Sequence, residues 1–351
     1  MRFGLGPLTM ELPVGWRCVG CIKPSDGSCC GKKQVDVYEE ALEASTTAEW
    51  WGFDSVWAGE ANFTKAGFNS SSSVVAAGMA QRTEFARVGV MPILGLVNAM
   101  YIAEEVACID NISAGRAVVA AQVPTAEVAA AWGGSNSPDR IADDIAVLRK
   151  SWGPNPFSHK SAHHTIPMEN EIHVQARGLD KISVQPKPAQ LEMPLWLSGD
   201  SSAAKIATDL SIPYLGPAQS TLDELRPLYA GAVTDGTRIV PLAREVFVAP
   251  TRERAYELAQ DAIAGLYRAM GKDSSDFESL VRDRFVIGDP DSCIEQLYRY
   301  QNELGVNYVL ARIVYHDMHP GESARAIQLF GQAVVPEFRM FGLPNEIRKV
   351  V

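Results

Sequence analysis

Short apolar runs alternate with amphipathic helical stretches along most of this chain, and that alternation restricts its possible folds more than any other feature. A repeating order of strand and helix is typical of a parallel sheet, because each crossover helix brings the chain back to the end of the sheet where the previous strand began. The pattern predicts eight strands, each followed by a helix: residues 3–8, 52–58, 86–94, 117–122, 195–197, 214–215, 245–249 and 308–314.

Eight strand–helix units in 351 residues predict an α/β fold, a single TIM-type (β/α)8 barrel with insertions after strands 1 and 4. A doubly wound open sheet is the second possibility. It requires a glycine-rich dinucleotide turn after the first strand, and Gly4-Leu5-Gly6 lacks the third glycine and opens no helix. We expect one domain over 1–351, with a cysteine-rich loop insertion over 9–34 and an irregular insertion over 153–194.

The charge balance narrows the possible partners. Acidic residues number 42 and basic residues 32, which gives a formal net charge of −10. An acidic surface disfavours nucleic acid and anionic membranes as partners. The uncharged stretch 88–103 is shorter than the roughly 20 apolar residues that span a membrane, and Glu11 comes too early for the apolar core of a signal peptide. We therefore expect a cytoplasmic protein.

Four of the six cysteines fall within the first insertion, at Cys18, Cys21, Cys29 and Cys30. Two pairs of thiols could bind zinc, but adjacent cysteines form an awkward second pair. A disulfide or redox pair and free thiols are the other interpretations. Because the insertion follows the first strand and contains Gly, Pro and Ser, we expect a lid over the pocket. Cys108 is expected in the core, as is Cys293.

Four segments, in order along the chain, resemble one known family. They are residues 50–60 (WWGFDSVWAGE), 104–116 (EEVACIDNISAGR), 186–199 with its MPLWLSG ending, and 288–309 with GDP at its start and ELGVNYV at its end. Together they are similar to the bacterial-luciferase-like family of flavin-dependent monooxygenases and oxidoreductases. The resemblance implies a flavin or deazaflavin bound across the strand ends, and dimers that pack through the helices around the second and third strands.

A loop of small residues between the fifth strand and its helix is the first candidate site. Backbone N–H groups at a helix N-terminus favour an anion, and the resemblance makes this loop the binding site for the flavin phosphate. An ordinary helix cap is the alternative. The resemblance adds Arg140 as a phosphate partner, whereas Val123 stands where the family has another arginine. Asp200 is a further departure from the family pattern, because it puts a carboxylate beside the expected phosphate. The loop consists of Ser198, Gly199, Asp200, Ser201 and Ser202.

The resemblance also places residues around the flavin ring. Glu60 ends the second strand at the family's acidic position, or it is a solvated loop residue. Met91-Pro92 falls where the family has a cis peptide bond, which costs little before proline, so we predict a cis bond there. Gln122 ends the fourth strand, where its amide could bond the ring edge or a loop.

The general base is the main departure from the family. Ala61 and Asn62 follow Glu60 where a catalytic histidine is expected, and neither takes up a proton near neutral pH. We assign a catalytic position to Asn62 and a proton-transfer role to His316, with His319 beside it, because both histidines follow the eighth strand. No metal site is predicted.

These features favour a two-component monooxygenase that uses reduced FMN from a separate flavin reductase, with O2, on a small organic substrate such as those of secondary metabolism. One alternative is hydride transfer with a deazaflavin. Another is a non-catalytic luciferase-type subunit that stabilises an active paralogue. The expected assembly is a homodimer, or a heterodimer with that paralogue.

Overall fold

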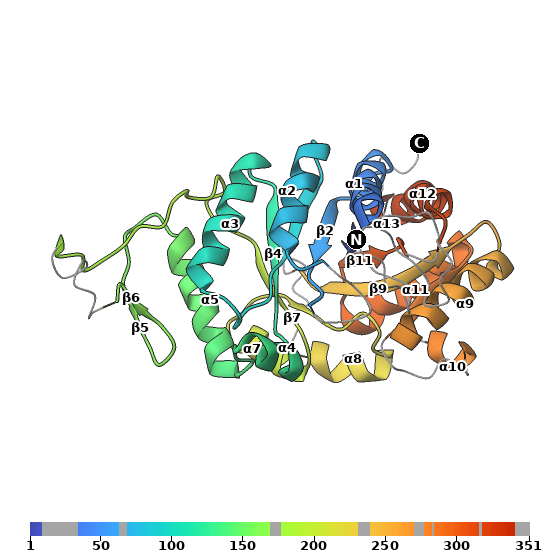
Figure 1. The fold of residues 1–351 in the computed structure, drawn as a ribbon. Coiled ribbons are helices and arrows are strands. Elements are labelled where there is room, and N and C mark those ends of the chain that lie inside the picture. The colour runs from blue at the N-terminus through green and yellow to red at the C-terminus, as the bar shows by residue number, and fades with distance from the viewer. Residues whose placement is uncertain are drawn as a thin grey trace.

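A computed structural model describes residues 1–8, 34–62, 69–168, 177–230, 239–269, 277–282, 284–315 and 318–340. Strands and helices alternate through these ranges (Figure 1). The elements are β1 (Arg2–Leu8), α1 (Gln34–Trp50), β2 (Ser55–Gly59), α2 (Ser72–Arg82), β3 (Arg87–Met91), α3 (Ala99–Ile112), β4 (Ala117–Gln122), α4 (Ala126–Trp132), α5 (Pro138–Trp152), β5 (His159–Lys160), β6 (Thr165–Ile166), β7 (Leu195–Ser198), α7 (Ser201–Asp209), β8 (Tyr214–Leu215), α8 (Leu222–Tyr229), β9 (Pro241–Val248), α9 (Arg252–Ala269), α10 (Phe277–Val281), β10 (Phe285–Gly288), α11 (Pro290–Leu304), β11 (Tyr308–Arg312), α12 (Pro320–Leu329), the π-helix η1 (Phe330–Val334) and α13 (Val335–Met340).

The described strands form a curled parallel sheet in the order β10-β9-β11-β1-β2-β3-β4-β7-β8. One isolated parallel bridge, Gly216 with Leu242, connects the β8 end of the sheet to β9. The prediction of a parallel α/β fold is confirmed, whereas closure into a full barrel is limited to that bridge because β8 has two residues. The sheet also contains β10, which the sequence analysis did not predict and which pairs with the second half of β9.

Aromatic side chains fill the space inside the curl. The ring centroids of Trp57 and Trp196 lie 4.8 Å apart, and those of Trp196 and Tyr308 lie 5.1 Å apart. The Trp57 indole and the Tyr308 hydroxyl each donate to Ser55 Oγ at 2.7 Å. A Cβ at Gly89 would lie 2.0 Å from the Trp57 ring, so only glycine fits there. This packed layer leaves the strand ends above it as the place for chemistry.

The helix starts follow capping signals in the sequence. Ser71, Asn98 and Ser137 accept from backbone N–H groups at the starts of α2, α3 and α5. Asp200 and Asp289 do the same for α7 and α11. Because these helices follow parallel strands, their N-termini lie near the carboxyl ends of the sheet.

The second insertion, expected to be irregular, contains a short antiparallel hairpin. Strands β5 and β6 pair antiparallel and project away from the sheet (Figure 1). Several side-chain contacts connect the hairpin to α5; among them, His159 Nε2 lies 2.7 Å from Asp143 Oδ1 and His164 Nε2 lies 2.5 Å from Asp144 Oδ1. The hairpin is therefore attached to the helix that begins beside the predicted phosphate site.

Candidate functional site

The carboxyl ends of the strands carry polar side chains just above the aromatic layer. Side chains alternate along each strand, so residues two positions beyond the inward Trp57 layer also face inward. By this rule Met91, Gln122, Glu245 and Arg312 lie on the inner face of the mouth, and the register pairs Arg312 with Glu245 across β11 and β9. We define these four residues as the mouth layer.

Glu245 provides the carboxyl group of the mouth layer, and its pKa is strongly shifted. Its side chain is 1% exposed and accepts from Tyr315 Oη at 2.8 Å, Arg312 Nη1 at 3.1 Å and Gln219 Nε2 at 3.4 Å. Burial raises the pKa of Glu245 to about 7, although the bonds from Tyr315 and Gln219 act in the opposite direction. A group with this pKa can hold or release a proton near neutral pH.

Sequence reasoning missed the ion pair between Glu245 and Arg312. Glu245 was placed at the start of a predicted strand over 245–249, whereas β9 begins at Pro241. The available signal was a charged residue inside a buried strand, since unpaired charges are rarely buried. Arg312 gave the same signal near the end of β11.

Glu60 has a structural role instead of facing solvent. Its Oε1 accepts from the Ser72 backbone N–H at 3.0 Å and from Ser72 Oγ at 2.8 Å, and its Oε2 accepts from Ile93 N at 3.2 Å. Burial raises the pKa of Glu60, and these hydrogen bonds partly oppose the shift. The carboxyl group thus joins the end of β2 to the start of α2 and to the loop after β3.

The predicted cis bond between Met91 and Pro92 is wrong. Among the described residues, the cis bonds precede Pro7, Pro167 and Pro186. Pairing with β4 continues past Met91, because Gln122 N donates to Pro92 O at 2.8 Å and Leu94 N donates to Gln122 O at 2.9 Å. An extended trans chain maintains this pairing. The Gln122 amide also donates to Met91 O at 2.7 Å, so it bonds the neighbouring strand end.

The predicted phosphate loop, Ser198 to Ser202, lies between β7 and α7 as expected, but a carboxylate already occupies the helix start. Asp200 Oδ1 accepts from Ser202 N at 2.9 Å and from Ser202 Oγ at 2.6 Å. The Ser202 hydroxyl and the backbone N–H groups lower the pKa of Asp200, although its partial burial opposes them. Asp200 therefore acts as an N-cap, the alternative that the sequence left open. Gly199 and Ser201 flank it.

Arg140 lies in the first turn of α5, with its side chain 21% exposed. Its Nε donates to Asp144 Oδ1 at 2.9 Å. Asp144 is fully buried and also accepts from Gly95 N at 2.8 Å and contacts His164. The carboxylate of Asp144 thus fixes Arg140 against the loop after β3 and the β5–β6 hairpin.

The remaining candidates have different outcomes. Asn62 follows β2 and is half-buried, whereas His316 lies outside the described residues, as do Cys18, Cys21, Cys29 and Cys30. His319 caps α12, because its Nδ1 accepts from Gly321 N at 3.1 Å.

Cys108 is exposed, which contradicts its expected core position, while Cys293 is buried. The described part of the chain contains no metal-binding group of three or more acidic, histidine or cysteine side chains.

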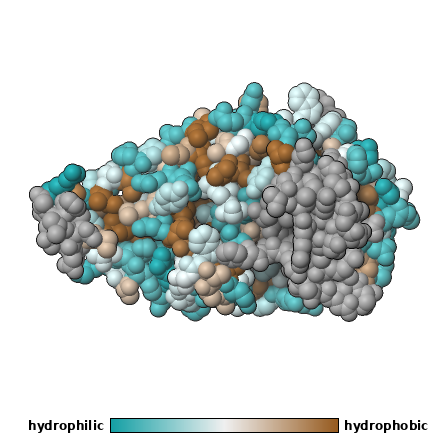
Figure 2. All heavy atoms as spheres, viewed as in Figure 1, coloured by the Kyte–Doolittle hydropathy of each residue, from teal (hydrophilic) through white to brown (hydrophobic). Residues whose placement is uncertain are grey.

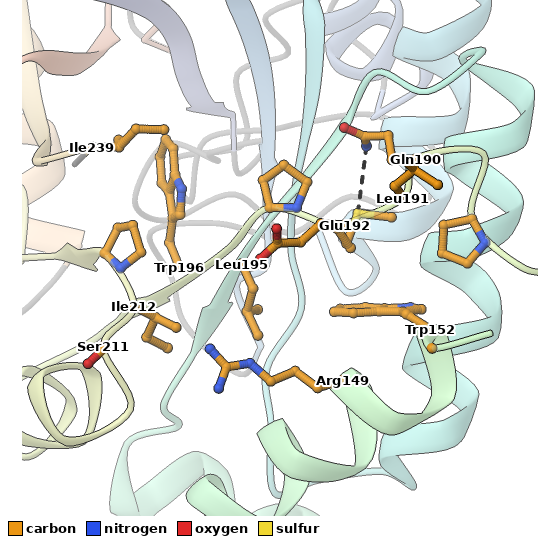
Figure 3. A pocket seen from close by; sticks show the side chains of 15 residues that line it. Arg149, Trp152, Gln190, Leu191, Glu192, Leu195, Trp196, Ser211, Ile212 and Ile239 are labelled. Carbon is orange, nitrogen blue, oxygen red and sulfur yellow. Dashed lines mark hydrogen bonds between the residues drawn. The ribbon is translucent and has the colours of Figure 1, made fainter. Parts of the chain in front are cut away.

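A cavity of about 720 Å³ lies at the amino ends of the strands. Leu195 at the start of β7 and Ile239 just before β9 line it together with Trp152. Figure 3 shows Arg149 and Glu192 on opposite sides of Leu195. In barrels of this kind the amino ends of the strands serve stability and the carboxyl ends carry chemistry. We therefore place the candidate active site at the mouth layer.

Polar side chains cover much of the face in Figure 2, and hydrophobic groups form separate patches among them. Exposed apolar side chains occur around α2 and α3, where Val74 is 69% exposed, Phe85 82% and Tyr101 57%. No described helix is long and apolar enough to cross a membrane.

A protein-family model, described as luciferase-like monooxygenase, matches residues 18–308. The chain belongs to the luciferase-like monooxygenase family. A search of curated proteins finds no match. Family membership confirms the resemblance inferred from the four segments and supports an oxidoreductase.

Solved structures share the fold at low sequence identity. A monooxygenase from Streptomyces bottropensis, RslO1, has a TM-score of 0.79 and 18% identity, and the match covers 96% of this chain and all of that one. The oxygenating constituent of 3,6-diketocamphane monooxygenase from Pseudomonas putida, solved with FMN, has a TM-score of 0.73 and 17% identity, covering 96% and 98%. An F420-dependent secondary alcohol dehydrogenase has a TM-score of 0.62 and 18% identity, covering 85% and 94%.

The described residues fit one end of a flavin better than the other. At the ring end, the mouth layer places the polar side chains of Gln122, Glu245 and Arg312 at the carboxyl ends of the strands, where barrel enzymes carry chemistry. The phosphate end fits poorly, because Asp200 occupies the α7 N-terminus and Val123 provides no charge.

Proposed function

We propose that this protein is the oxygenating component of a two-component flavin monooxygenase, using reduced FMN and O2 on a small organic substrate. The observation that carries the proposal is the family match over residues 18–308. The polar mouth layer at the carboxyl ends of the strands, the side where barrel enzymes carry chemistry, supports it.

The comparison of folds favours FMN over a deazaflavin. TM-scores are 0.79 and 0.73 for two monooxygenases, one of them solved with FMN, against 0.62 for the F420-dependent dehydrogenase. Hydride transfer with a deazaflavin is therefore the second candidate. Binding measurements with the two cofactors separate these functions.

When bound, reduced FMN would supply the electrons that activate oxygen. The chain's own contribution is to bind the substrate, exclude water and manage protons. Glu245 is the described group best suited to hold a proton, since burial brings its pKa to about 7 and Tyr315 and Arg312 fix its orientation. Its carboxyl group could serve in place of the histidine that Ala61 and Asn62 replace.

Glu245 also helps to judge the third candidate function, in which the chain is a non-catalytic partner subunit. Loss of the family histidine favours that role, while a buried group that titrates near neutral pH at the mouth favours an active enzyme. A flavin reductase would supply FMN by transient contact. The exposed Val74, Phe85 and Tyr101 around α2 and α3 support a dimer through these helices, with itself or a paralogue.

Anaerobic titration tests the proposal. The full chain is titrated with reduced FMN and, separately, with reduced F420, and binding is followed by absorbance and fluorescence. We expect micromolar binding of reduced FMN and weaker binding of F420. When air is then admitted, the bound reduced FMN should be oxidised at a rate different from that of free reduced FMN, which reacts with O2 by itself. Tight binding of F420 alone would establish the hydride-transfer function. Flavin binding with oxidation at the rate of free reduced FMN, changed only when a co-purified paralogue is added, would establish the partner-subunit role.

A further inference from the structure

We propose that Asp200 excludes the cofactor phosphate from the start of α7, so that this site recognises a flavin by its ring and ribityl chain. This inference rests on the proposed flavin-dependent function and makes it more specific. It predicts that riboflavin, which lacks the phosphate, binds nearly as well as FMN.

The first support is the geometry of the helix start. A helix N-terminus binds an anion through N–H groups that have no partner within the helix. Here Asp200 Oδ1 lies 2.9 Å from Ser202 N and 2.6 Å from Ser202 Oγ, so the chain's own carboxylate holds two donors that a phosphate would need. A phosphate bound there would have to displace the cap or approach its negative charge.

The loop cannot readily move to make room. A Cβ at Gly199 would lie 2.9 Å from Ala203 Cβ and 3.2 Å from Val123 Cβ, so the backbone is closely packed on both sides. Behind it, the Tyr214 hydroxyl lies 2.8 Å from Gly199 O and 3.3 Å from Asp200 O. These contacts fix Asp200 where it caps the helix.

The neighbouring charges give no compensation. Arg140 is the cation that the family resemblance assigns to the phosphate, and its Nε already bonds the buried Asp144 at 2.9 Å. The Arg140–Asp144 ion pair sums to zero formal charge, and Val123 adds none. The negative charge of Asp200 at the helix start is therefore not offset by these residues.

Asp289 provides a matched control within the same chain. It caps α11 as Asp200 caps α7, accepting from Ser292 N at 2.8 Å, and it also follows a glycine with positive φ. Its helix follows β10, at the end of the sheet order away from β4 and β7. A substitution there reproduces the loss of a charged cap without touching the proposed site.

The test compares dissociation constants for FMN and riboflavin in three full-length proteins: wild type, Asp200→Asn and Asp289→Asn. Asparagine retains the cap and removes the charge. A phosphate held by charge-assisted bonds would favour FMN by roughly 10- to 100-fold. We expect a preference of less than about threefold in wild type, rising by about fivefold or more in Asp200→Asn. In Asp289→Asn the preference should stay as in wild type.

A strong wild-type preference for FMN, or an unchanged preference in Asp200→Asn, would overturn the inference while leaving flavin binding intact. Failure of wild type to bind either flavin would instead contradict the proposed function and the inference with it. Circular dichroism establishes that each variant is folded. If Asp200→Asn does not fold, Asp200→Ser, which also retains an N-cap, takes its place with the same expected outcome.

Discussion

Two junctions in this protein have nearly the same local structure and different surroundings. At one, β7 leads through Gly199 and Asp200 into α7; at the other, β10 leads through Gly288 and Asp289 into α11. The glycines have φ of +153° and +142°, and each aspartate caps its helix. The first junction follows β7, which pairs with β4, whereas the second follows β10, the strand at the opposite end of the sheet order.

The difference between the junctions shows that cap chemistry alone does not make a binding site. Both sequences read as strand, glycine, aspartate and helix, and both helix starts are satisfied internally. What distinguishes the α7 junction is its neighbours, since the Gln122 end of β4 and the Ser198 end of β7 are paired there.

The glycines should show the largest effect. A Cβ would lie 2.9 Å from Ala203 Cβ at Gly199 and 2.7 Å from Ser292 Cβ at Gly288. Backbone strain of about 1–3 kcal/mol adds to overpacking of a similar size, so Gly199→Ala and Gly288→Ala should each lower the free energy of unfolding by roughly 2–5 kcal/mol. Urea denaturation measures this.

Gly133→Ala is the control for those two substitutions. Gly133 also has positive φ, +65°, but nothing lies within 4 Å of its added Cβ. Gly133→Ala should therefore lower the free energy of unfolding by about 1–2 kcal/mol, from backbone strain alone. If either junction variant proved no less stable than Gly133→Ala, close packing would not be the reason for that glycine.

Acidification should have a smaller effect, with the same sign at both junctions. Hydrogen bonds from Ser202 and Ser292 lower the pKa of Asp200 and Asp289 respectively. A lowered pKa in the folded state stabilises the protein above the ordinary carboxyl pKa, and this contribution is lost as pH falls through the folded value.

The matching experiment measures urea denaturation from pH 7 down to pH 3. Asp200→Ala should cost about 1 kcal/mol at pH 7, and its difference from wild type should shrink on acidification. Asp289→Ala should follow the same trend. A difference that stayed constant with pH would mean that the charged form of the aspartate contributes nothing to the cap.

Much of the fold could be read from periodicity. The bounds of β4 match the sequence prediction, Ala117–Gln122, because a strong apolar pattern ends at a clear signal there. The short β10 was missed, since three apolar residues and a glycine give little periodicity. The start of β9 was also missed, because Pro241 and the charged Arg244 and Glu245 interrupt its apolar pattern, although the first position of a strand tolerates proline.

The site was less predictable because it depends on contacts between distant segments. Arg140 was predicted as a phosphate partner, but it bonds the buried Asp144, whose link to His164 depends on the hairpin. Glu245 gains its perturbed pKa from burial beside Arg312 and Tyr315, which are nearly 70 positions away. Sequence patterns report local structure and do not contain such pairings.

Hydrogen–deuterium exchange with and without reduced FMN tests directly whether a flavin binds at the carboxyl ends of the central strands. Peptides covering residues 195–210 and 285–304 report the two junctions in one experiment. Reduced FMN is expected to slow exchange in the first peptide and in the β4 end near Gln122, and to leave the second peptide unchanged. Protection confined to the α11 peptide, or to neither, would contradict flavin binding at these strand ends.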